Sequence, residues 1–484
     1  MSTSEAHSKA LLRRVYPLNA HDLTEEQIAV AFAMTSRRPE PFDEIAQQVS
    51  QQKAADFHER WVLGYGHASV AEHAVVHLAV ENVSRLACDT LEDNRLGSYT
   101  EKSSRYQVLP EGSYFFPPEL DAQPDLAQAY RQACQQLFRS YHHLIDASMA
   151  HLRSVDPQQQ NERDSAYNMR LRRVATDHCR ATLPAATLTN VGVTANARVL
   201  EYAITKLLSS ELAEERELGL ELREQGRSIT PTLIKYAEEN RYLRETHQEQ
   251  RRLSAETVHA SPNDPGALIP AKLLDWDTQA EEKLAAALLY REAHSSYETV
   301  WERVLGMTSQ KRQGIIDRCT SALGAHDSPV REFELVGYTF EFLMDYGAYR
   351  EFKRHRMMSY IPQPLTIAHG YRTPDLIVEA DLSGVYQDNL GLAEEAQQKV
   401  AEFSPRLAEY LVTHAHYRRV LVRLNLRECY HLFKLRTSEL AHFAIREPVL
   451  AAMKLAVDTH PQFFHNLHLR DYPEWWPFTR PSAG

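Results

Sequence analysis

KRHRMMSY, residues Lys353–Tyr360, places four basic or titratable side chains in a row, followed by two methionines, a serine and a tyrosine. The residues before it alternate between apolar and polar over Tyr338–Met344, which predicts a β-strand. Tyr349–Arg356 is typical of a helix that ends in an irregular loop, because Pro362 and Pro364 fix their own φ and lack an amide donor. Arginines at the end of an element can bind a phosphate or an electron-rich ring, although a solvated basic surface gives the same pattern.

A second, altered copy of this region lies in the first half of the chain. DNRLGSY, which starts at Asp93, parallels RHRMMSY, which starts at Arg354, with an offset of 261 positions (354 − 93). Upstream, HASV parallels HDSP with an offset of 259, and downstream Asn196 parallels Asn425 with an offset of 229 (425 − 196). A repeat this long indicates a duplicated domain and not a solenoid. We therefore predict an α+β protein with two tandem copies of one domain, residues 1–258 and 268–484, joined by a Pro- and Gly-rich linker at 261–266.

Each copy is expected to contain helices, a strand, a basic loop, further helices, a second strand and a last helix. Valine is frequent in the apolar run at 74–80, so we expect a strand there and not a buried helix. The other elements expected in the first copy are strands at 11–16 and 187–194, helices at 24–34, 42–63, 84–91, 125–152, 169–179, 196–224 and 231–251, and a polar loop at 93–106. Those expected in the second copy, besides the strand and helix around KRHRMMSY, are a short apolar start at 272–276 and helices at 279–305 and 309–322.

The composition excludes several classes of protein. A net charge of −11 argues against a general nucleic-acid binder, so an anionic ligand needs a local arginine cluster. No apolar run approaches the roughly 20 residues needed to cross a bilayer, and the N-terminus lacks the apolar core of a signal peptide. The five cysteines are scattered and form no CxxC pair, which predicts reduced thiols in a cytoplasmic protein, with no disulfide framework and no metal site.

Motifs in both halves resemble the flavin-dependent thymidylate synthases. In the first half they are GHASVAEH from Gly66, SRLACDTLEDNRLGSYTEKSSRY from Ser84 and CRATLPAATLTNVGVTANAR from Cys179. The second half is similar to the same family in HDSPVRE, YREFKRHRMMSY and LNLRECYHLFKLRTSELAHFAIRE. The resemblance covers about Leu11–Ser228 and Lys272–Glu447, and the family signature, Arg-His-Arg followed at a fixed spacing by a serine and an Arg-Tyr pair, is specific as a long ordered pattern.

The resemblance implies that the two halves keep complementary parts of this signature. The first half keeps the serine and Arg-Tyr end but has Asp93 and Asn94 at the opening arginine and histidine. The second half keeps the opening but has Pro364 at the position of the serine. On this resemblance, the residues that bind the substrate nucleotide are Glu101, Ser103, Arg105, Arg180, Arg354 and Arg436.

The same complementarity continues further along the chain. Arg180 corresponds to Glu409 in the second half, whereas Arg436, at the arginine that activates the pyrimidine in the family, corresponds to Leu207 in the first half. Family active sites form between subunits, so the fused chain is expected to keep one composite site. On this resemblance, the flavin contacts are Ser69, Ser328, Arg354, His355, Arg356, Asn196, Arg198, Asn425, Arg427 and His431.

The implied reaction transfers a one-carbon unit from methylenetetrahydrofolate to C5 of dUMP or a related pyrimidine nucleotide, with FAD as cofactor and NADPH as reductant. Arg436 is the expected catalytic residue, because a guanidinium at the pyrimidine edge stabilises charge that develops on the ring. Glu351 stands where the family commonly has glutamine, and we expect its carboxylate to repel a phosphate unless it is turned away or protonated. The family is typically a homotetramer, so two fused copies are expected to form a homodimer.

Two other classes of function are compatible with the same motifs. The chain can be a flavin or nucleotide sensor that binds its ligand without turnover, or an assembly partner that stabilises a complete synthase, because fold alone does not establish function. A flavin absorption band that is bleached by NADPH distinguishes the enzyme from the sensor.

Overall fold

The structure is a computed structural model that describes residues 16, 18, 23–36, 38–63, 68–258 and 268–480. The chain divides into two compact units. Unit 1 comprises Met1–Val83, Thr90–Lys102 and Thr189–Ala255, and unit 2 comprises Ser84–Asp89, Ser103–Leu188 and Glu256–Gly484. Unit 2 therefore contains the whole second copy together with a long segment of the first. Among the described helices, none is both long and apolar enough to cross a membrane.

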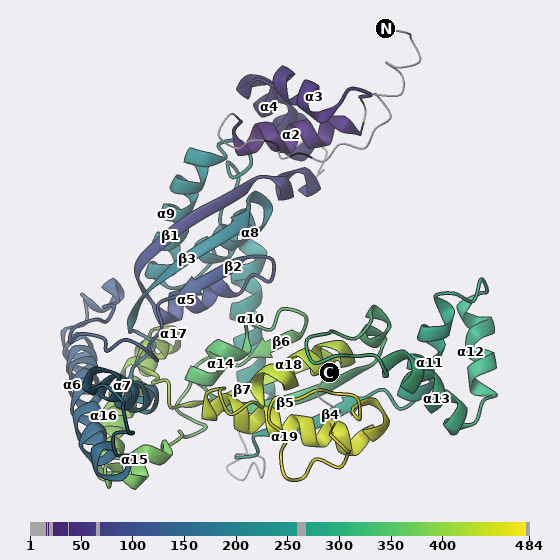
Figure 1. The fold of residues 1–484 in the computed structure, drawn as a ribbon. Helices are drawn as coiled ribbons and strands as arrows, with labels where there is room; N and C mark the ends of the chain where they lie inside the picture. Colours follow the sequence, from purple (N-terminus) through teal and green to yellow (C-terminus); the bar gives the residue numbers. More distant parts are fainter. Residues whose placement is uncertain are drawn as a thin grey trace. The chain divides into compact units, whose positions relative to one another are not determined.

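Unit 1 is built on a three-stranded antiparallel sheet with strand order β1-β3-β2 (Figure 1). Its strands are β1 (Val75–Ser84), β2 (Ser98–Glu101) and β3 (Leu188–Asn196). Its helices are α2 (Glu25–Thr35), α3 (Phe42–Gln48), α4 (Gln51–Phe57), the π-helical turn η1 (His58–Leu63), the 3-10 turn η2 (Ala68–His73), α8 (Ala197–Leu208), α9 (Ala213–Ile229) and α10 (Arg241–Thr257), and α5 (Arg85–Glu92) is shared with unit 2. The strands expected at 74–80 and 187–194 are confirmed.

Several expected helices of the first copy are interrupted. The predicted helix at 42–63 is three elements, because the Ser50 side chain accepts a hydrogen bond from the Lys53 amide and starts α4 anew. The predicted helix at 196–224 breaks after α8 at Ser209, and the one at 231–251 begins only at Arg241. The predicted loop at 93–106 contains β2, which pairs with β3, so long-range pairing overrides its polar composition. Three expected features fall outside the described residues. The linker at 261–266 and the start of GHASVAEH lie wholly outside them, and the strand at 11–16 lies outside them except for Tyr16.

Unit 2 contains a four-stranded antiparallel sheet with strand order β4-β5-β7-β6. Its strands are β4 (Ala271–Trp276), β5 (Gly337–Asp345), β6 (Ser359–Pro362) and β7 (Tyr417–Asn425). The predicted strand at 338–344 is confirmed as β5, whose aromatic side chains Tyr338, Phe340 and Phe342 are fully buried. The prediction of an irregular loop directly after Arg356 is wrong, because residues Ser359–Pro362 form β6 and pair with β7. Pro362 does not prevent this pairing, because β6 is an edge strand, where a missing amide donor is tolerated.

Helices flank this sheet and form a separate layer. Those near the sheet are α14 (Tyr346–Phe352), α18 (Leu426–Arg436), α19 (Phe443–Thr459), α11 (Ala280–Tyr290), α12 (Tyr297–Leu305) and α13 (Ser309–Thr320), with 3-10 turns η5 (Arg331–Leu335) and η7 (Pro461–Phe463). The predicted helix at 279–305 is split into α11 and α12, because the Ser296 side chain caps α12. The predicted helix at 349–356 is α14, which begins three residues earlier at the Asp345 cap and ends before Lys353.

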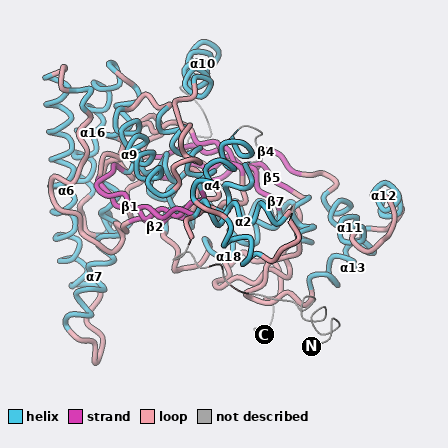
Figure 2. Tube along the Cα trace, turned by 90° about the horizontal axis from the view of Figure 1, so that it is seen from above, coloured by secondary structure: helices cyan, strands magenta, loops and turns pink. Residues whose placement is uncertain are grey.

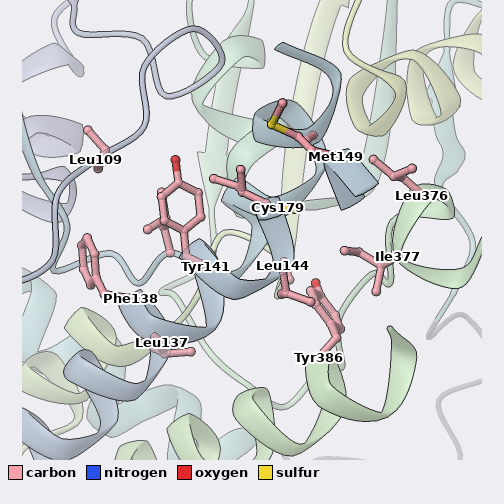
Figure 3. Packing of buried hydrophobic residues seen from close by; sticks show 14 of the residues in the cluster. Leu109, Leu137, Phe138, Tyr141, Leu144, Met149, Cys179, Leu376, Ile377 and Tyr386 are labelled. Atoms are coloured by element: carbon pink, nitrogen blue, oxygen red, sulfur yellow. The ribbon is translucent and has the colours of Figure 1, made fainter. Parts of the chain in front are cut away.

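The separate layer combines helices from both copies. The first copy supplies η3 (Pro118–Leu120), α6 (Pro124–Val155), α7 (Asp164–Cys179) and η4 (Arg180–Thr182), and the second supplies α15 (Asp375–Glu379), α16 (Ser383–Phe403), α17 (Pro405–Ala408) and η6 (Glu409–Leu411). Figure 2 shows α6, α7 and α16 side by side. Between them lies one apolar core in which Leu144 of α6 lies beside Tyr386 of α16 (Figure 3). Each fully buried side chain of this size contributes about 1.5–3 kcal/mol, so the first copy's helices are firmly part of unit 2.

Backbone hydrogen bonds in unit 2 relate the two copies by a local two-fold axis. The Ala185 amide donates to the Val412 carbonyl at 2.8 Å. The His414 amide donates to the Leu183 carbonyl at 2.9 Å. The two bonds are equivalent under the offset of 229: Ala185 corresponds to His414 (414 − 185), and Leu183 corresponds to Val412 (412 − 183). The two copies therefore meet as equivalent halves, and the fold is two tandem copies of an α+β domain.

Candidate functional site

The first copy contributes an arginine pair held by one carboxylate. Arg105 donates from Nε and Nη2 to the two oxygens of Asp177, both at 2.9 Å. Arg180 approaches the same carboxylate with its Nε at 3.3 Å. Asp177 lies in the last turn of α7 and Arg180 opens η4, so the two face each other at a spacing of three residues. This arrangement fixes the planar faces of two guanidinium groups in one place.

Glu351 joins these arginines to the second copy. Its Oε1 accepts from Arg180 Nη2 at 3.3 Å, and its Oε2 accepts from Arg436 Nη1 at 3.2 Å. Arg436 Nη2 also donates to the Glu351 backbone carbonyl at 3.2 Å. A continuous chain of contacts thus runs from Arg105 to Arg436 within unit 2 of one chain. Glu351 is neither turned away nor left to repel an anion, because two guanidinium groups neutralise its charge.

Arg436 also contacts a buried imidazole. Its Nε donates to His355 Nε2 at 3.0 Å, and His355 Nδ1 lies 3.1 Å from Glu428 Oε1. Burial lowers the pKa of His355 against the opposing effect of Glu428, so its ring is neutral near pH 7. Burial opposes ionisation of Glu428, but the hydrogen bonds from His355 and His431 outweigh it and lower the pKa of this carboxyl. The order Arg436–His355–Glu428 is therefore cation, neutral ring, anion.

The cluster carries an excess of positive charge. Among the residues that the structure describes, Arg105, Arg180 and Arg436 share two carboxylates, Asp177 and Glu351. Burial lowers the pKa of Arg436 against the opposing effect of Glu351, and the charges of Arg354 and Arg105 lower it further, so the Arg354 guanidinium lies near that of Arg436. Glu428, behind His355, offsets part of this excess. A phosphate monoester, with about −1.5 to −2 charges at pH 7, complements such a cluster.

The remaining predicted residues fall into two groups. In unit 2, Arg354 and Arg356 are exposed on either side of buried His355, and Ser103 Oγ accepts from the Arg105 amide at 3.2 Å. Also in unit 2, Asn425 caps α18, Arg427 pairs with Glu334, His431 is exposed on α18, and Ser328 lies in an exposed loop. In unit 1, Glu101 ends β2, Ser69 is exposed in η2, Asn196 caps α8, and Arg198 pairs with Glu72. The structure thus brings Ser103, Arg105, Arg180, Arg354, His355 and Arg436 into one region of unit 2.

Three side chains that the sequence analysis did not assign complete this region. Asp177 holds two arginines, and Glu428 holds His355. His442 is buried with its Nε2 3.4 Å from Asp177 Oδ1. The signal for Asp177 was its position three residues before Arg180 in one helical turn. Glu428 and His431 have the same spacing on α18, which also placed them on one face.

His355, Glu428 and His431 lie close enough to hold a metal ion, with ligand atoms within 4.8 Å of one another. The contact between Arg436 and His355 opposes this arrangement. An arginine can only donate, so His355 Nε2 accepts and its Nδ1 carries the proton. A protonated nitrogen cannot ligate a metal, so a cation here requires Arg436 to leave His355.

The chain is similar to proteins of known families over most of its length. The family described as thymidylate synthase complementing protein matches residues 18–232 and 272–462. A UPF0159 protein of Chlamydia muridarum is 30% identical over 438 residues, covering 87% of this chain and 82% of the relative, and one of Thermoplasma acidophilum is 28% identical over 466 residues, covering 90% and 92%. A flavin-dependent thymidylate synthase of Clostridium tetani is 25% identical over 213 residues, covering 44% of this chain and 82% of the relative. The chain belongs to the thymidylate synthase complementing protein family.

Proposed function

We propose that this protein is a flavin-dependent enzyme that methylates C5 of dUMP, or of a related pyrimidine nucleotide, with methylenetetrahydrofolate and NADPH. The observation that carries the proposal is the convergence of Arg105 and Arg180 from one copy with Arg436 from the other around Glu351. Each copy lacks the arginines of the other, so the composite arrangement is the one in which all the expected contacts can be made together.

The residues of the chain take distinct roles in this proposal. Arg105 and Arg180 bind the nucleotide phosphate, which exchanges for part of their contacts with Asp177 and Glu351. Arg436 lies at the edge of the pyrimidine and stabilises charge that develops on the ring when C5 reacts. His355 stays neutral and holds Arg436, so the guanidinium is positioned before the ligand binds.

The side chains around Arg354 also fit a flavin. Arg354, Arg356, Arg427 and His431 present exposed or half-exposed nitrogen donors, and their chemistry suits the phosphates and ring carbonyls of FAD. When bound, FAD supplies the reducing equivalents for the one-carbon transfer. The corresponding residues Asn196 and Arg198 of the first copy make the same local contacts, a helix cap and an ion pair with an upstream glutamate. We propose in addition that two chains associate as a homodimer in the cytoplasm.

A second candidate is a nucleotide or flavin sensor without turnover. Asp177 and Glu351 already accept hydrogen bonds or ion pairs from the arginines of the site, so these side chains are held in place before any ligand binds. Ligand exchange and turnover therefore have to be measured separately.

The test begins with the visible spectrum of the purified protein and its response to NADPH. A flavin band that bleaches supports the enzyme, and a band that does not bleach supports the flavin sensor. The absence of any band after incubation with FAD contradicts both of these and leaves the nucleotide sensor, which dUMP titration tests.

Titration with dUMP then tests the arginines. Arg105→Ala and Arg436→Ala each remove a charge-assisted bond worth about 1.5–3 kcal/mol, so each is expected to weaken dUMP binding by roughly one to two orders of magnitude. Arg180→Glu, which copies Glu409 of the other half, should weaken it at least as much. Glu409→Gln is the matched control and should leave dUMP affinity unchanged. Because the contacts lie within one chain, mixing the Arg105→Ala and Arg436→Ala proteins should restore nothing; restored binding would mean that the site forms between chains.

A further inference from the structure

We propose that Glu428 is a positioning residue of the nucleotide site, which acts through His355 to fix the direction of the Arg436 guanidinium. The inference rests on the proposed function for its ligand, but its geometric part stands alone. Glu428 and His355 have side-chain exposures of only 3% and 2%, so solvent does not compete for their contact.

The direction of each hydrogen bond in this row is fixed by chemistry. Arg436 Nε can only donate, so His355 Nε2, 3.0 Å away, has to be the acceptor. A neutral imidazole that accepts at Nε2 carries its proton at Nδ1, and Nδ1 lies 3.1 Å from Glu428 Oε1. An ionised carboxylate can only accept, so it selects this tautomer over the other.

Glu428 is itself rigidly held. It occupies the first turn of α18, and its amide donates to the Asn425 side chain at 2.8 Å. The carboxylate is therefore attached to a capped helix that also carries Arg436 at its other end. Glu428 and His355 thus hold the Nε side of the Arg436 guanidinium, and its Nη atoms point at Glu351.

Removing Glu428 removes the acceptor of the buried Nδ1–H, so the cost of an unpaired buried donor then opposes this tautomer, while the Arg436 contact still favours it. In the other tautomer, Nε2–H of His355 would face Nε–H of Arg436, two donors in contact, and the guanidinium would have to turn away. The Nη atoms that meet Glu351, and the ligand in the proposed function, would turn with it.

The first copy indicates that Glu428, His355 and Arg436 act together as one unit. Asn94 and Leu207 stand at the positions of His355 and Arg436, and Val199 stands at the position of Glu428 (428 − 199 = 229). The helix cap that positions residue 428 is nevertheless retained, because Asn196 accepts from the Val199 amide. The first copy therefore keeps the backbone of this turn and has none of the three side chains.

The experiment compares Glu428→Ala and Glu428→Asp with the parent protein. The control is Glu394→Gln, which alters a second carboxylate that contacts a buried histidine, His416, at 3.1 Å. Nitrogen-15 NMR of labelled histidine, with His355→Asn used to assign the signal, reports the tautomer, and calorimetry reports dUMP affinity. We expect the Nδ1–H form in the parent, its loss in Glu428→Ala, about tenfold weaker dUMP binding, partial recovery in Glu428→Asp, and no change in either measurement in Glu394→Gln.

A double variant isolates the route through Arg436. In an Arg436→Ala background, Glu428→Ala should cause no further loss of dUMP affinity, because the group that it positions is already absent. Additive losses would overturn the proposal. So would an Nε2–H tautomer in the parent, an unchanged tautomer in Glu428→Ala, or stoichiometric Zn²⁺ binding that depends on Glu428. If the parent fails to bind dUMP, the proposed function fails, and the tautomer measurement still decides the role of Glu428 toward His355.

Discussion

Two turns related by the local two-fold axis carry opposite charges. In the first copy, Asp177 lies in the last turn of α7 and η4 starts at Arg180; in the second, α17 and η6 place Arg406 and Glu409 at the same positions (406 − 177 and 409 − 180 are both 229). Asp177 binds arginines, whereas Glu409 accepts from Arg406 at 2.6 Å. The backbone hydrogen bonds that follow the two turns are equivalent. The main chain of the two turns is thus the same, whereas the acidic and the basic side chain have exchanged positions between the copies.

The inversion extends to a second pair of elements. Asp89 of α5 corresponds to Arg350 of α14, and Glu92 and Asp93 correspond to Lys353 and Arg354, all with the offset of 261. Within unit 2, Lys353 and Arg418 both bind the carboxylate of Asp89. Burial opposes ionisation of Asp89, but these two cations outweigh it and lower its pKa. The copies are therefore complementary in charge where they meet.

The largest effect is expected from breaking this complementarity. Asp89→Asn removes a buried carboxylate that Lys353 and Arg418 share, which should cost about 3–5 kcal/mol of unfolding free energy. Urea denaturation measures it. The control is Asp93→Asn on the same segment, whose side chain is 56% exposed and pairs with Lys206; it should cost about 1 kcal/mol or less. Equal losses in the two variants would show that the buried pair does not hold the copies together.

A smaller, pH-dependent effect distinguishes the helix caps at the equivalent positions Ser84 and Asp345 (345 − 84 = 261). Both accept from an amide three residues on, but burial raises the pKa of Asp345 to about 6. The folded protein then binds a proton more tightly than the unfolded chain, whose aspartate titrates near about 3.9. Protonated Asp345 therefore contributes to the free energy of unfolding, and this contribution is fully present below pH 4. It falls by up to about 3 kcal/mol as pH rises to 6 and changes little at higher pH.

Asp345→Ser gives the second copy the residue of the first. It keeps a capping oxygen and removes the titration, so its stability relative to the parent should improve between pH 4.5 and pH 7. Urea denaturation at the two values tests this. Parallel changes in the parent and the variant would contradict the assignment to Asp345.

The smallest effect should be the same in both copies. Asn196 and Asn425 cap α8 and α18 by accepting from Val199 and Glu428 amides at 2.9 and 2.8 Å. Asn196→Ala and Asn425→Ala should therefore each cost about 1 kcal/mol, and serine at either position should restore most of it. A clearly larger loss at Asn425, measured by chemical denaturation, would mean that the cap also supports Glu428.

The sequence predicted the features that are encoded locally. The strand at β5, the long helix α6 and the offset of 229 all follow from patterns within one segment, and the offset later matched the hydrogen bonds between the copies. The helix breaks at Ser50, Ser209 and Ser296 were missed, because the apolar pattern continues through them. The motif resemblance named the arginines, and the spacing of three residues could have paired Arg180 with Asp177. The pairing of Arg105 with Asp177 and of Arg180 with Glu351 joins segments 72 and 171 residues apart, which no local pattern encodes.

The ion pair between Asp89 and Lys353 also determines which halves can recognise each other. If two first copies met through the same hydrogen bonds, Asp89 of one would face Glu92 of the other, because Glu92 takes the place of Lys353. If two second copies met, Lys353 would face Arg350. Either pairing buries like charges together, which is strongly unfavourable away from water. Pairing between unlike halves is therefore favoured over pairing between like halves.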